Sequence, residues 1–358
     1  MLSFIEEHES TWEKLQNESR PIFIYGMGDG AEKIMSVFLK LGIKVEGIFA
    51  SDEFVRGHSF LGYKVKKLSE VEAEYGDDIV VVLAFGASYQ ELIDKIHDIA
   101  EKHTLYVPDV PVTGQGIFNY DFCQKHEGEL NHVYSILADE MSRKVYANII
   151  NFKISGDIHY LDEVTTPKNE IYKKIVKPNL NESYVDLGAY NGDTVKEILE
   201  LTKGRYVDIY AIEPDRKNFK KLQRFSEGMR NFNCYNCVAW SKDTKIPFNS
   251  KAGRQASVST SGKMTEARSV DSILDGKPAT IIKMDVEGCE REAIWGSALT
   301  IRKYAPKLMV SLYHRNEDIY ELPLLINMLN PGYNIYIRHQ LYIPAWETNL
   351  YAVYENRQ

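Results

Sequence analysis

Two segments of the chain share one pattern, in which an apolar run ends at a glycine and leads into an amphipathic helix. One is the run at 22–25 with the turn 26–31, and the other is the run at 184–187 with the turn 188–194. Strand, glycine turn and helix in this order open a βαβ unit. Such a unit needs a parallel sheet with helices on its faces, so the pattern predicts two α/β units in one chain.

Length and the spacing of the apolar runs divide the chain into three parts. At roughly 100–200 residues per domain, 358 residues allow two domains and a connecting segment. We expect a small Rossmann-like parallel-sheet domain at 1–110, a mainly helical connector at 111–180 with a helix near 128–152, and a second sheet domain at 181–358. The strands expected in the first domain are 22–25, 45–49, 79–84 and 105–107.

The second domain alternates strand and helix until its last two strands. Only a short loop with a proline separates these two, so they should form an antiparallel hairpin. This pattern predicts an α/β fold, a doubly wound seven-stranded sheet with an antiparallel edge. The expected strands are 184–188, 209–212, 234–238, 280–284, 308–312, 334–338 and 349–354.

Charge and composition exclude several classes of protein. Lys and Arg number 43 against 51 Asp and Glu, a formal charge of −8, whereas nucleic-acid binding needs an excess of clustered basic residues. No apolar run reaches the roughly 18–20 residues of a membrane span, and the acidic start lacks the features of an export signal, so we expect a cytoplasmic protein. Four cysteines are too few for a disulfide scaffold, and the Cys234–Cys237 spacing lacks the second pair that a zinc site needs.

The turn after the second domain's first strand indicates a nucleoside site. Gly188 and Gly192 allow a ligand to approach the backbone, and Glu213 ends the next strand, where a carboxylate can accept hydrogen bonds from ribose hydroxyls. This turn has two glycines instead of the three usual in pyrophosphate binders, and Asp186 places a negative charge at its entry. The combination favours a cationic nucleoside such as S-adenosylmethionine over a dinucleotide.

A second group of acidic residues follows the strand at 280–284. Asp285 and Glu287 are two positions apart, so in extended backbone both side chains point to the same side. We therefore expect both carboxylates to face the cleft beyond the strand ends.

At this point the sequence resembles the FkbM-type methyltransferases, over about residues 130–356. The resemblance rests on VDLGAYNGDT at 185–194, AIEPD at 211–215, the block 269–297 with IIKMDVEGCEREAIWGS, and APKLMVSLYHRNED at 305–318. It implies a sheet of the class I methyltransferase type, S-adenosylmethionine as donor, and an O-methyl product on a sugar, a nucleotide-linked sugar or a related metabolite.

The resemblance also implies residue roles. Asp186, Gly188 and Asn191 would line the methionine part, Glu213 would hold the ribose, and Asp193 and Thr194 would cap the following helix. Ala189 in the same turn would also belong to the cofactor site. Asp215 would approach the adenine amino group, with Val238 and Ala239 beside the ring.

Transfer to a hydroxyl requires a base, for which Asp285, Glu287 and His314 are the candidates. His314 is attractive because the ordinary pKa of histidine, about 6.5, suits proton removal near neutrality. A divalent cation between Asp285 and Glu287 would also acidify a hydroxyl, but no third ligand is evident, so no metal is predicted. The segment 247–269 is expected to be either a long acceptor loop or lid, with Arg254, Lys263 and Arg268 available for an anionic substrate, or a plain solvated loop.

The first glycine turn leaves three alternatives open. Gly26, Gly28 and Ala31, with Asp52 after the second strand, satisfy the dinucleotide pattern with alanine in its third place. The domain is similar to small modules that precede sugar-modifying transferases, which implies a nucleotide or nucleotide-linked sugar as ligand. A structural or homodimerising role is the third possibility.

The sequence therefore predicts an S-adenosylmethionine-dependent O-methyltransferase with a small-molecule acceptor. Two other functions are weighed against it. One is an NAD(P)-dependent sugar-modifying oxidoreductase that uses the first glycine turn, and the other is a non-catalytic nucleotide-binding module.

Overall fold

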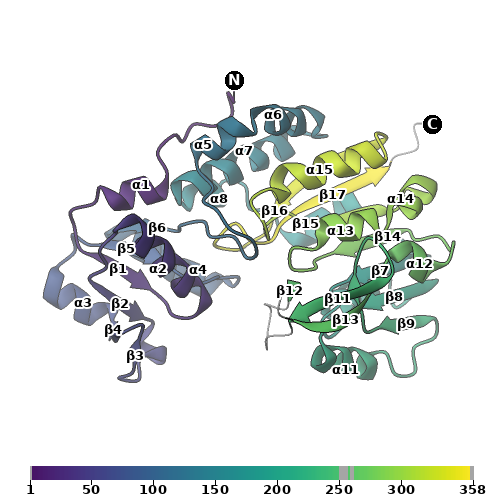
Figure 1. Ribbon diagram of the computed structural model, residues 1–358, viewed down its shortest axis with the longest axis horizontal. Helices are drawn as coiled ribbons and strands as arrows, with labels where there is room; N and C mark the ends of the chain where they lie inside the picture. Colours follow the sequence, from purple (N-terminus) through teal and green to yellow (C-terminus); the bar gives the residue numbers. More distant parts are fainter. Residues whose placement is uncertain (1, 250–256, 259–261, 355–358) are drawn as a thin grey trace.

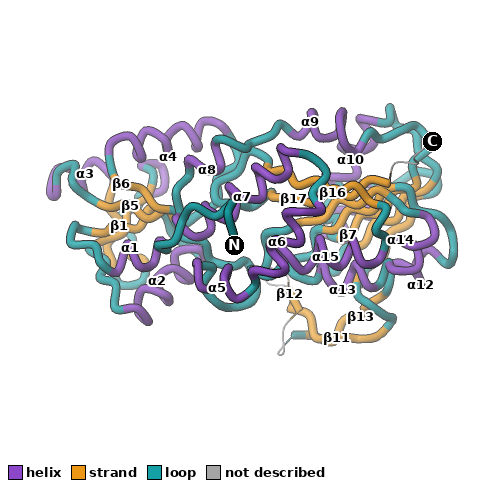
Figure 2. Tube along the Cα trace, turned by 90° about the horizontal axis from the view of Figure 1, so that it is seen from above, coloured by secondary structure: helices purple, strands orange, loops and turns teal. Residues whose placement is uncertain are grey.

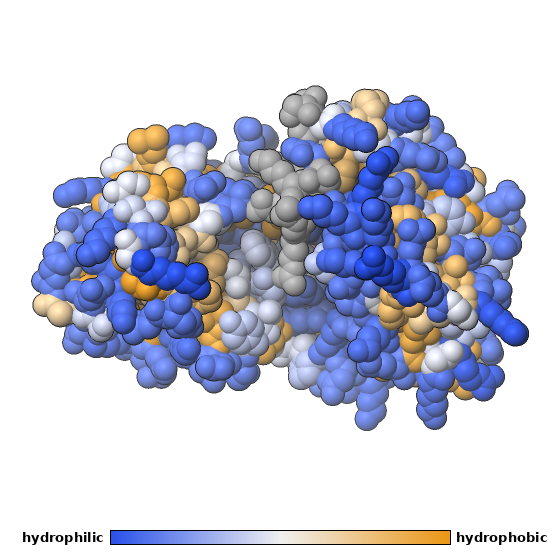
Figure 3. All heavy atoms as spheres, turned by 90° about the horizontal axis from the view of Figure 1, so that it is seen from below, coloured by the Kyte–Doolittle hydropathy of each residue, from blue (hydrophilic) through white to orange (hydrophobic). Residues whose placement is uncertain are grey.

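The computed structural model describes residues 2–249, 257–258 and 262–354. Figure 1 shows two sheet-containing lobes, one at each end of the long axis, with α5 to α8 above and between them. Seen from above, the strands fall into two groups separated by the helical segment that includes α6 and α7 (Figure 2). Hydrophilic side chains cover most of the face seen from below on both lobes, with apolar ones in smaller groups (Figure 3).

The first lobe contains a sheet with strand order β3-β4-β2-β1-β5-β6. Its pairs are parallel except β3 with β4. The strands are β1 (Ile22–Tyr25), β2 (Gly47–Ala50), β3 (Ser59–Phe60), β4 (Tyr63–Lys67), β5 (Val80–Leu83) and β6 (Thr104–Tyr106). The four expected strands are present. β3 and β4 were missed because only Val65 of their residues is buried, so they lack an apolar run.

Helices cover this sheet and seal its core. They are α1 (Thr11–Gln16), α2 (Asp29–Leu41), α3 (Leu68–Tyr75) and α4 (Gln90–Lys102), with a 3₁₀ turn η1 (Asp52–Phe54) after β2. α2 starts directly against β5, since a Cβ on Gly30 would lie 2.3 Å from the Ala84 carbonyl oxygen. Glycine is required at this position because the helix backbone touches the strand backbone.

The segment between the lobes is helical, and where one helix was expected near 128–152 the structure has two. α6 ends at Ile136, and α7 begins at Glu140 after Asp139, whose carboxylate accepts a hydrogen bond from the Ser142 backbone N–H. Leu137 between them has extended backbone, so the apolar spacing continues across a break. The elements are α5 (Tyr120–Lys125), α6 (Glu127–Ile136), α7 (Glu140–Ser155), α8 (His159–Asp162), α9 (Lys168–Ile171) and the π-helical turn η2 (Tyr172–Val176).

The second lobe is built on a sheet with order β16-β17-β15-β14-β7-β8-β9, which among the described residues confirms the predicted seven strands. β16 and β17 form the expected antiparallel hairpin, and β17 also pairs antiparallel with β15. The strands are β7 (Ser183–Leu187), β8 (Asp208–Ile212), β9 (Phe232–Tyr235), β14 (Ile281–Met284), β15 (Lys307–Ser311), β16 (Tyr333–His339) and β17 (Thr348–Tyr354).

Helices pack on both faces of this sheet, as a doubly wound fold requires. η2, α10 (Asp193–Leu201) and α11 (Arg216–Phe225) bury side chains with one set of strand residues. α12 (Val270–Leu274), α13 (Glu290–Trp295), α14 (Ala298–Tyr304) and α15 (Asp318–Leu329) pack with the alternate set.

The prediction of a loop at 247–269 is wrong for most of the described residues of this segment, because they form paired strands. β11 (Thr244–Asn249) and β13 (Lys263–Arg268) are antiparallel partners in a small sheet of order β10-β13-β11-β12, with β10 (Val238–Ala239) and β12 (Ser257–Val258). Lys263 is exposed, and Arg254 lies outside the described residues. Arg268 pairs with Asp243 at 3.6 Å and lies over the Tyr235 ring, so it supports the small sheet.

The chain also folds the two lobes onto each other through its backbone. Ala87 of the first lobe forms an isolated antiparallel bridge with Ile343 of the second, and the N–H of Val107 donates to the carbonyl of Gly156 in the helical segment between them. None of the described helices has both the length and the apolar character needed to cross a membrane.

His339 at the end of β16 makes stability depend on pH. It is fully buried, with Nε2 3.1 Å from the Tyr342 carbonyl oxygen and Nδ1 3.0 Å from the Thr348 hydroxyl. Burial lowers its pKa to about 4. Because the folded-state pKa lies below the unfolded value of about 6.5, its contribution is complete above that value and is lost as the pH falls toward 4.

Between pH 7 and pH 5, the urea-unfolding free energy of the wild type should fall by ~2 kcal/mol more than that of His339→Gln. Equal losses in both proteins would contradict this assignment.

Candidate active site

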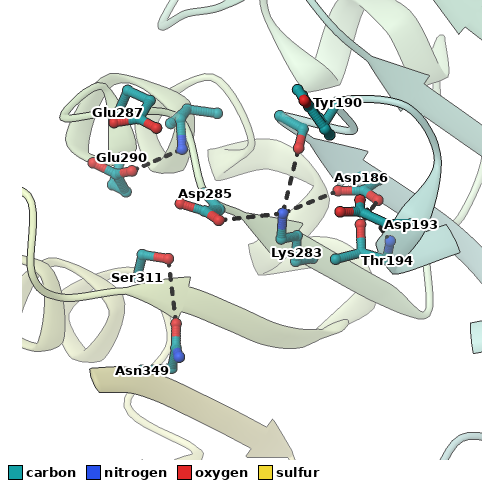
Figure 4. Close-up of polar contacts among 12 residues, drawn as sticks. Asp186, Tyr190, Asp193, Thr194, Lys283, Asp285, Glu287, Glu290, Ser311 and Asn349 are labelled. Atoms are coloured by element: carbon teal, nitrogen blue, oxygen red, sulfur yellow. Dashed lines mark hydrogen bonds and ion pairs between the residues drawn. The ribbon is translucent and has the colours of Figure 1, made fainter. Parts of the chain in front are cut away.

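A buried ion pair connects β7 and β14, two neighbouring strands of the main sheet. Asp186 on β7 is fully buried and lies in register with Lys283 on β14, whose Nζ is 3.5 Å from its Oδ1. Thr194 donates a hydrogen bond to the other oxygen at 2.5 Å. Figure 4 shows Lys283 between Asp186 and Asp285, which is 3.6 Å away. Burial raises the pKa of Asp186, and the Lys283 ammonium opposes that shift.

The turn after β7 passes closely over the end of β14. Gly188 has a φ of +81°, and a Cβ there would lie 1.9 Å from the Asp285 carbonyl oxygen. Its N–H and that of Ala189 both donate to the carbonyl of Ile212 at the end of β8, at 3.0 Å. The turn is therefore fixed by both neighbouring strands, and glycine is the residue that its position allows.

Glu213 lies where β8 ends, with 6% of its surface exposed. Its Oε1 accepts a hydrogen bond from the Asp215 N–H at 2.8 Å, and its Oε2 accepts one from the Tyr190 N–H at 2.9 Å. Burial raises the pKa of Glu213 to about 7. Each carboxylate oxygen can accept a second hydrogen bond, so the group can still bind two hydroxyls.

Two cavities meet at the strand ends. The smaller, of about 110 Å³, is lined by Glu213, Val238 and Ala239. The larger, of about 380 Å³, lies between the lobes. Both are lined by Gly188, Tyr190, Asp285 and Glu287. Tyr190, which has a φ of +47° and was not predicted from sequence, therefore lies between two binding spaces.

Other residues expected at the cofactor lie elsewhere. Asp193 and Thr194 line the larger cavity. The N-cap residue of α10 is Gly192, which makes no side-chain cap, but Asp193 Oδ1 accepts a hydrogen bond from the Thr194 N–H in the first turn at 2.9 Å. Asp215 accepts hydrogen bonds from the backbone N–H groups of Lys217 and Asn218 and so caps α11.

Three more of the expected residues do not line either cavity. Asp186 and Ala189 are fully buried behind the turn, and Asn191 is half-buried.

The connector between the lobes reaches the turn after β14. A Cβ on Gly288, whose φ is +87°, would lie 2.2 Å from the Thr113 hydroxyl. The Thr113 N–H donates to the carbonyl of His314 at 2.9 Å. Thr113 follows a proline-rich stretch, and the sequence carried no signal that this stretch would pack against the strand ends of the other domain.

His314 is fully buried among carboxylates. Its Nδ1 lies 2.9 Å from Glu290 Oε1, and its Nε2 lies 3.5 Å from Asp285 Oδ1 and 3.6 Å from Glu287 Oε2. Burial opposes its charge, but Glu290 and then Asp285 and Glu287 raise the pKa of His314 to about 10. The ordinary pKa on which the sequence argument relied is therefore shifted, and this imidazole is charged near neutrality.

Asp285 is held by neighbours on three sides. Tyr313 donates a hydrogen bond to its Oδ1 at 3.2 Å. Burial opposes its ionisation, but Lys283 and His314 lower its pKa below the ordinary value.

One set of residues in the described part of the chain could hold a metal ion. Ligand atoms of Asp285, Glu290 and His314 lie within 4.8 Å of one another. The sequence suggested a different pair of metal ligands, Asp285 and Glu287. Glu290 was not predicted as a ligand, although it is the last residue of the same motif.

The first lobe contributes one wall of the larger cavity. Asp29, Gly30 and Lys33 at the start of α2 line it, together with Tyr342 and Trp346 from the loop between β16 and β17. A third cavity of about 430 Å³ lies on the other side of the same glycine turn. Its lining includes Gly26, Ser51, Glu53 and the aromatic residues Tyr25, Phe54, Phe85 and Tyr89.

One family model and one solved structure agree with this architecture. Residues 186–335 match the family model of the methyltransferase FkbM domain, which confirms the resemblance seen in the motifs. The crystal structure of methyltransferase FkbM from Methylobacillus flagellatus KT superimposes with a TM-score of 0.72 at 23% identity, over 94% of this chain and 90% of that chain. Aeropyrum pernix fibrillarin in complex with S-adenosyl-L-methionine gives a TM-score of 0.33 at 14% identity, over 49% and 67%. A search of curated proteins finds no match.

Proposed function

Because residues 186–335 belong to the methyltransferase FkbM family, we propose that this chain transfers a methyl group from S-adenosylmethionine to a hydroxyl of a sugar, a nucleotide-linked sugar or a related metabolite. The observation that carries the proposal is the junction of the two cavities at Gly188, Tyr190, Asp285 and Glu287. A donor in one cavity and an acceptor in the other would meet at these residues.

The residues at the smaller cavity fit the donor. Asp186 does not line this cavity: it is buried behind the turn and paired with Lys283, so it supports the turn from below. Glu213 offers both carboxylate oxygens to ribose hydroxyls, and Val238 and Ala239 offer an apolar wall to a base. When bound, S-adenosylmethionine supplies a methyl group carried on a positively charged sulfur.

We assign proton removal to Glu287 and positioning of the hydroxyl to Asp285. Asp285 is a weak base because Lys283 and His314 lower its pKa. His314 is already protonated near neutrality, because its pKa is raised to about 10, so it cannot accept a further proton. Glu287 lines both cavities and lies beside His314 Nε2, so it is placed to receive a proton at the point where donor and acceptor meet.

The larger cavity suits a hydroxylated acceptor. Aromatic rings of Tyr313, Tyr342 and Trp346 and the amide groups of Gln340 and Asn349 line it, so it offers both flat apolar faces and hydrogen-bonding groups.

The third cavity favours a nucleotide-linked form of the acceptor. It has aromatic walls for a base and the Glu53 carboxylate for ribose hydroxyls. The glycine turn 26–30 lines both this cavity and the larger one, through Gly26 in the first and Gly30 in the second, so one extended ligand that follows the turn could reach both.

Glu213→Gln tests the donor site. We expect at least ~10-fold weaker S-adenosylmethionine binding by calorimetry, because the charged acceptor of two hydroxyl hydrogen bonds is lost. Wild-type affinity should rise from about pH 6 to pH 8, as Glu213 with its pKa of about 7 ionises. Affinity of the variant should stay flat over this range.

The same calorimetric titration with NAD(H) separates this proposal from the oxidoreductase. Binding of NAD(H) without any binding of S-adenosylmethionine would refute the methyltransferase assignment. Formation of S-adenosylhomocysteine with a panel of nucleotide-linked sugars, followed by mass spectrometry, tests the acceptor class, and a non-catalytic module would bind without forming product.

A further inference from the structure

We propose that Asp285, Glu290 and His314 bind a divalent cation of the Mg²⁺/Mn²⁺ type at the floor of the cleft between the lobes. Its role rests on the proposed methyl transfer, whereas its binding can be measured without donor or acceptor. Two carboxylates and one neutral imidazole are ligands that Mn²⁺ accepts, and Mg²⁺ shares the preference for carboxylate oxygen. Because the His314 ring is protonated near neutrality, the cation replaces one ring proton, which is released to solvent.

Three separate elements bring the ligands together. Asp285 directly follows β14, Glu290 is the first residue of α13, and His314 follows β15. One ligand atom from each lies within 4.8 Å of the other two. β14 and β15 are paired in parallel, so their carboxyl ends place Asp285 and His314 at the same edge of the sheet. The arrangement is thus fixed by the sheet and by the short turn before α13.

One of the two carboxylate oxygens of Glu290 is available to a cation. The side chain is fully buried, and its Oε1 accepts a hydrogen bond from the Val286 N–H at 2.8 Å. Within the described residues, its Oε2 has no hydrogen-bond partner. A buried carboxylate oxygen without a partner is costly, and a cation would satisfy it.

The charges around His314 also favour a cation. Its ring faces three carboxylates, those of Asp285, Glu287 and Glu290. The Lys283 ammonium lies near Asp285 but is shared with Asp186. Negative charge therefore exceeds positive charge at the cluster, and a divalent ion would restore the balance.

The cluster is open to the cleft on one side. About a third of the Asp285 side chain, 32%, is exposed, and the residue lines both cavities, whereas Glu290 and His314 are buried. A cation held here would keep free positions toward the acceptor. Binding a hydroxyl there would lower its pKa: the O–H bond breaks, its electron pair stays on oxygen, and the proton passes to Glu287.

The test uses MnCl₂ as the probe, with chelator-treated full-length protein and neither donor nor acceptor present. Electron paramagnetic resonance of free Mn²⁺ gives the bound fraction. We expect one site per chain in the wild type and at least 10-fold weaker binding in Asp285→Asn and in Glu290→Gln. Glu292→Gln, a carboxylate on the same helix but outside the cluster, should bind as the wild type does.

Circular dichroism and thermal melting accompany each variant, and Asp285→Asn, at a partly exposed position, keeps the test valid if Glu290→Gln does not fold. Absence of Mn²⁺ binding in folded wild type, or unchanged binding in Asp285→Asn, would overturn the site. S-adenosylmethionine titration of the same metal-free protein tests the methyltransferase proposal separately, so either can fail while the other stands.

Discussion

Alanine in place of Gly188 is expected to abolish donor binding, with S-adenosylmethionine affinity falling by about 100-fold or more. The new Cβ would lie 1.9 Å from the Asp285 carbonyl oxygen, so the turn or the end of β14 must move. Either movement displaces a residue that lines both cavities. The φ of +81° adds strain, because alanine avoids that region.

Gly204→Ala is the matched control for this change. Gly204 has a φ of +72°, and a Cβ there meets nothing within 4 Å. Alanine should therefore cost only the strain of the left-handed backbone, about 1–2 kcal/mol, and leave donor affinity unchanged. Calorimetry gives the affinities, and thermal melting shows whether each variant is folded. Donor binding by a folded Gly188→Ala protein at wild-type strength would rule out the role given to this turn.

The course of the main sheet could be predicted because its central strands are mainly apolar on both faces. β7, β8, β14 and β15 are almost entirely buried, so each forms a mainly apolar run, interrupted in β7 by Asp186 and in β14 by Lys283, that ends at a polar or glycine turn. The strands missed, such as β4 and β11, have mixed polar and apolar residues at an edge or in a small sheet. Pro247 inside β11 also argued for a loop.

The sequence allowed the residues of the site to be predicted, but not the ion pairs that connect them. Asp285, Glu287 and His314 belong to motifs, yet the effect of Glu290 on the His314 ring depends on a contact between α13 and the end of β15. Thr113 illustrates the same limit, since its contact with Gly288 joins segments from different parts of the chain. The pKa of a buried histidine depends on such contacts, which no spacing in the sequence reveals.

Replacing Asp285 with asparagine is expected to lower kcat by about 100-fold while donor affinity stays within a few-fold of wild type, because the hydroxyl is no longer held in line with the donor. Asparagine keeps the shape of the side chain and can still accept the Tyr313 hydrogen bond. It removes the charge that faces both Lys283 and His314, so the hydroxyl loses its positioning group and, in the cation proposal, a ligand. Asp186 and Glu213 are untouched, so donor binding should persist.

Separate measurements of kcat and of the donor dissociation constant distinguish this role from a structural one, with Glu292→Gln as the control on α13. A purely structural Asp285 would show parallel losses in stability, donor affinity and rate, because removing one partner of a buried charge network destabilises its surroundings. Turnover of Asp285→Asn at the wild-type rate would exclude the residue from the reaction. Loss of rate alone would place its carboxylate at the acceptor hydroxyl, because the two cavities meet beside it.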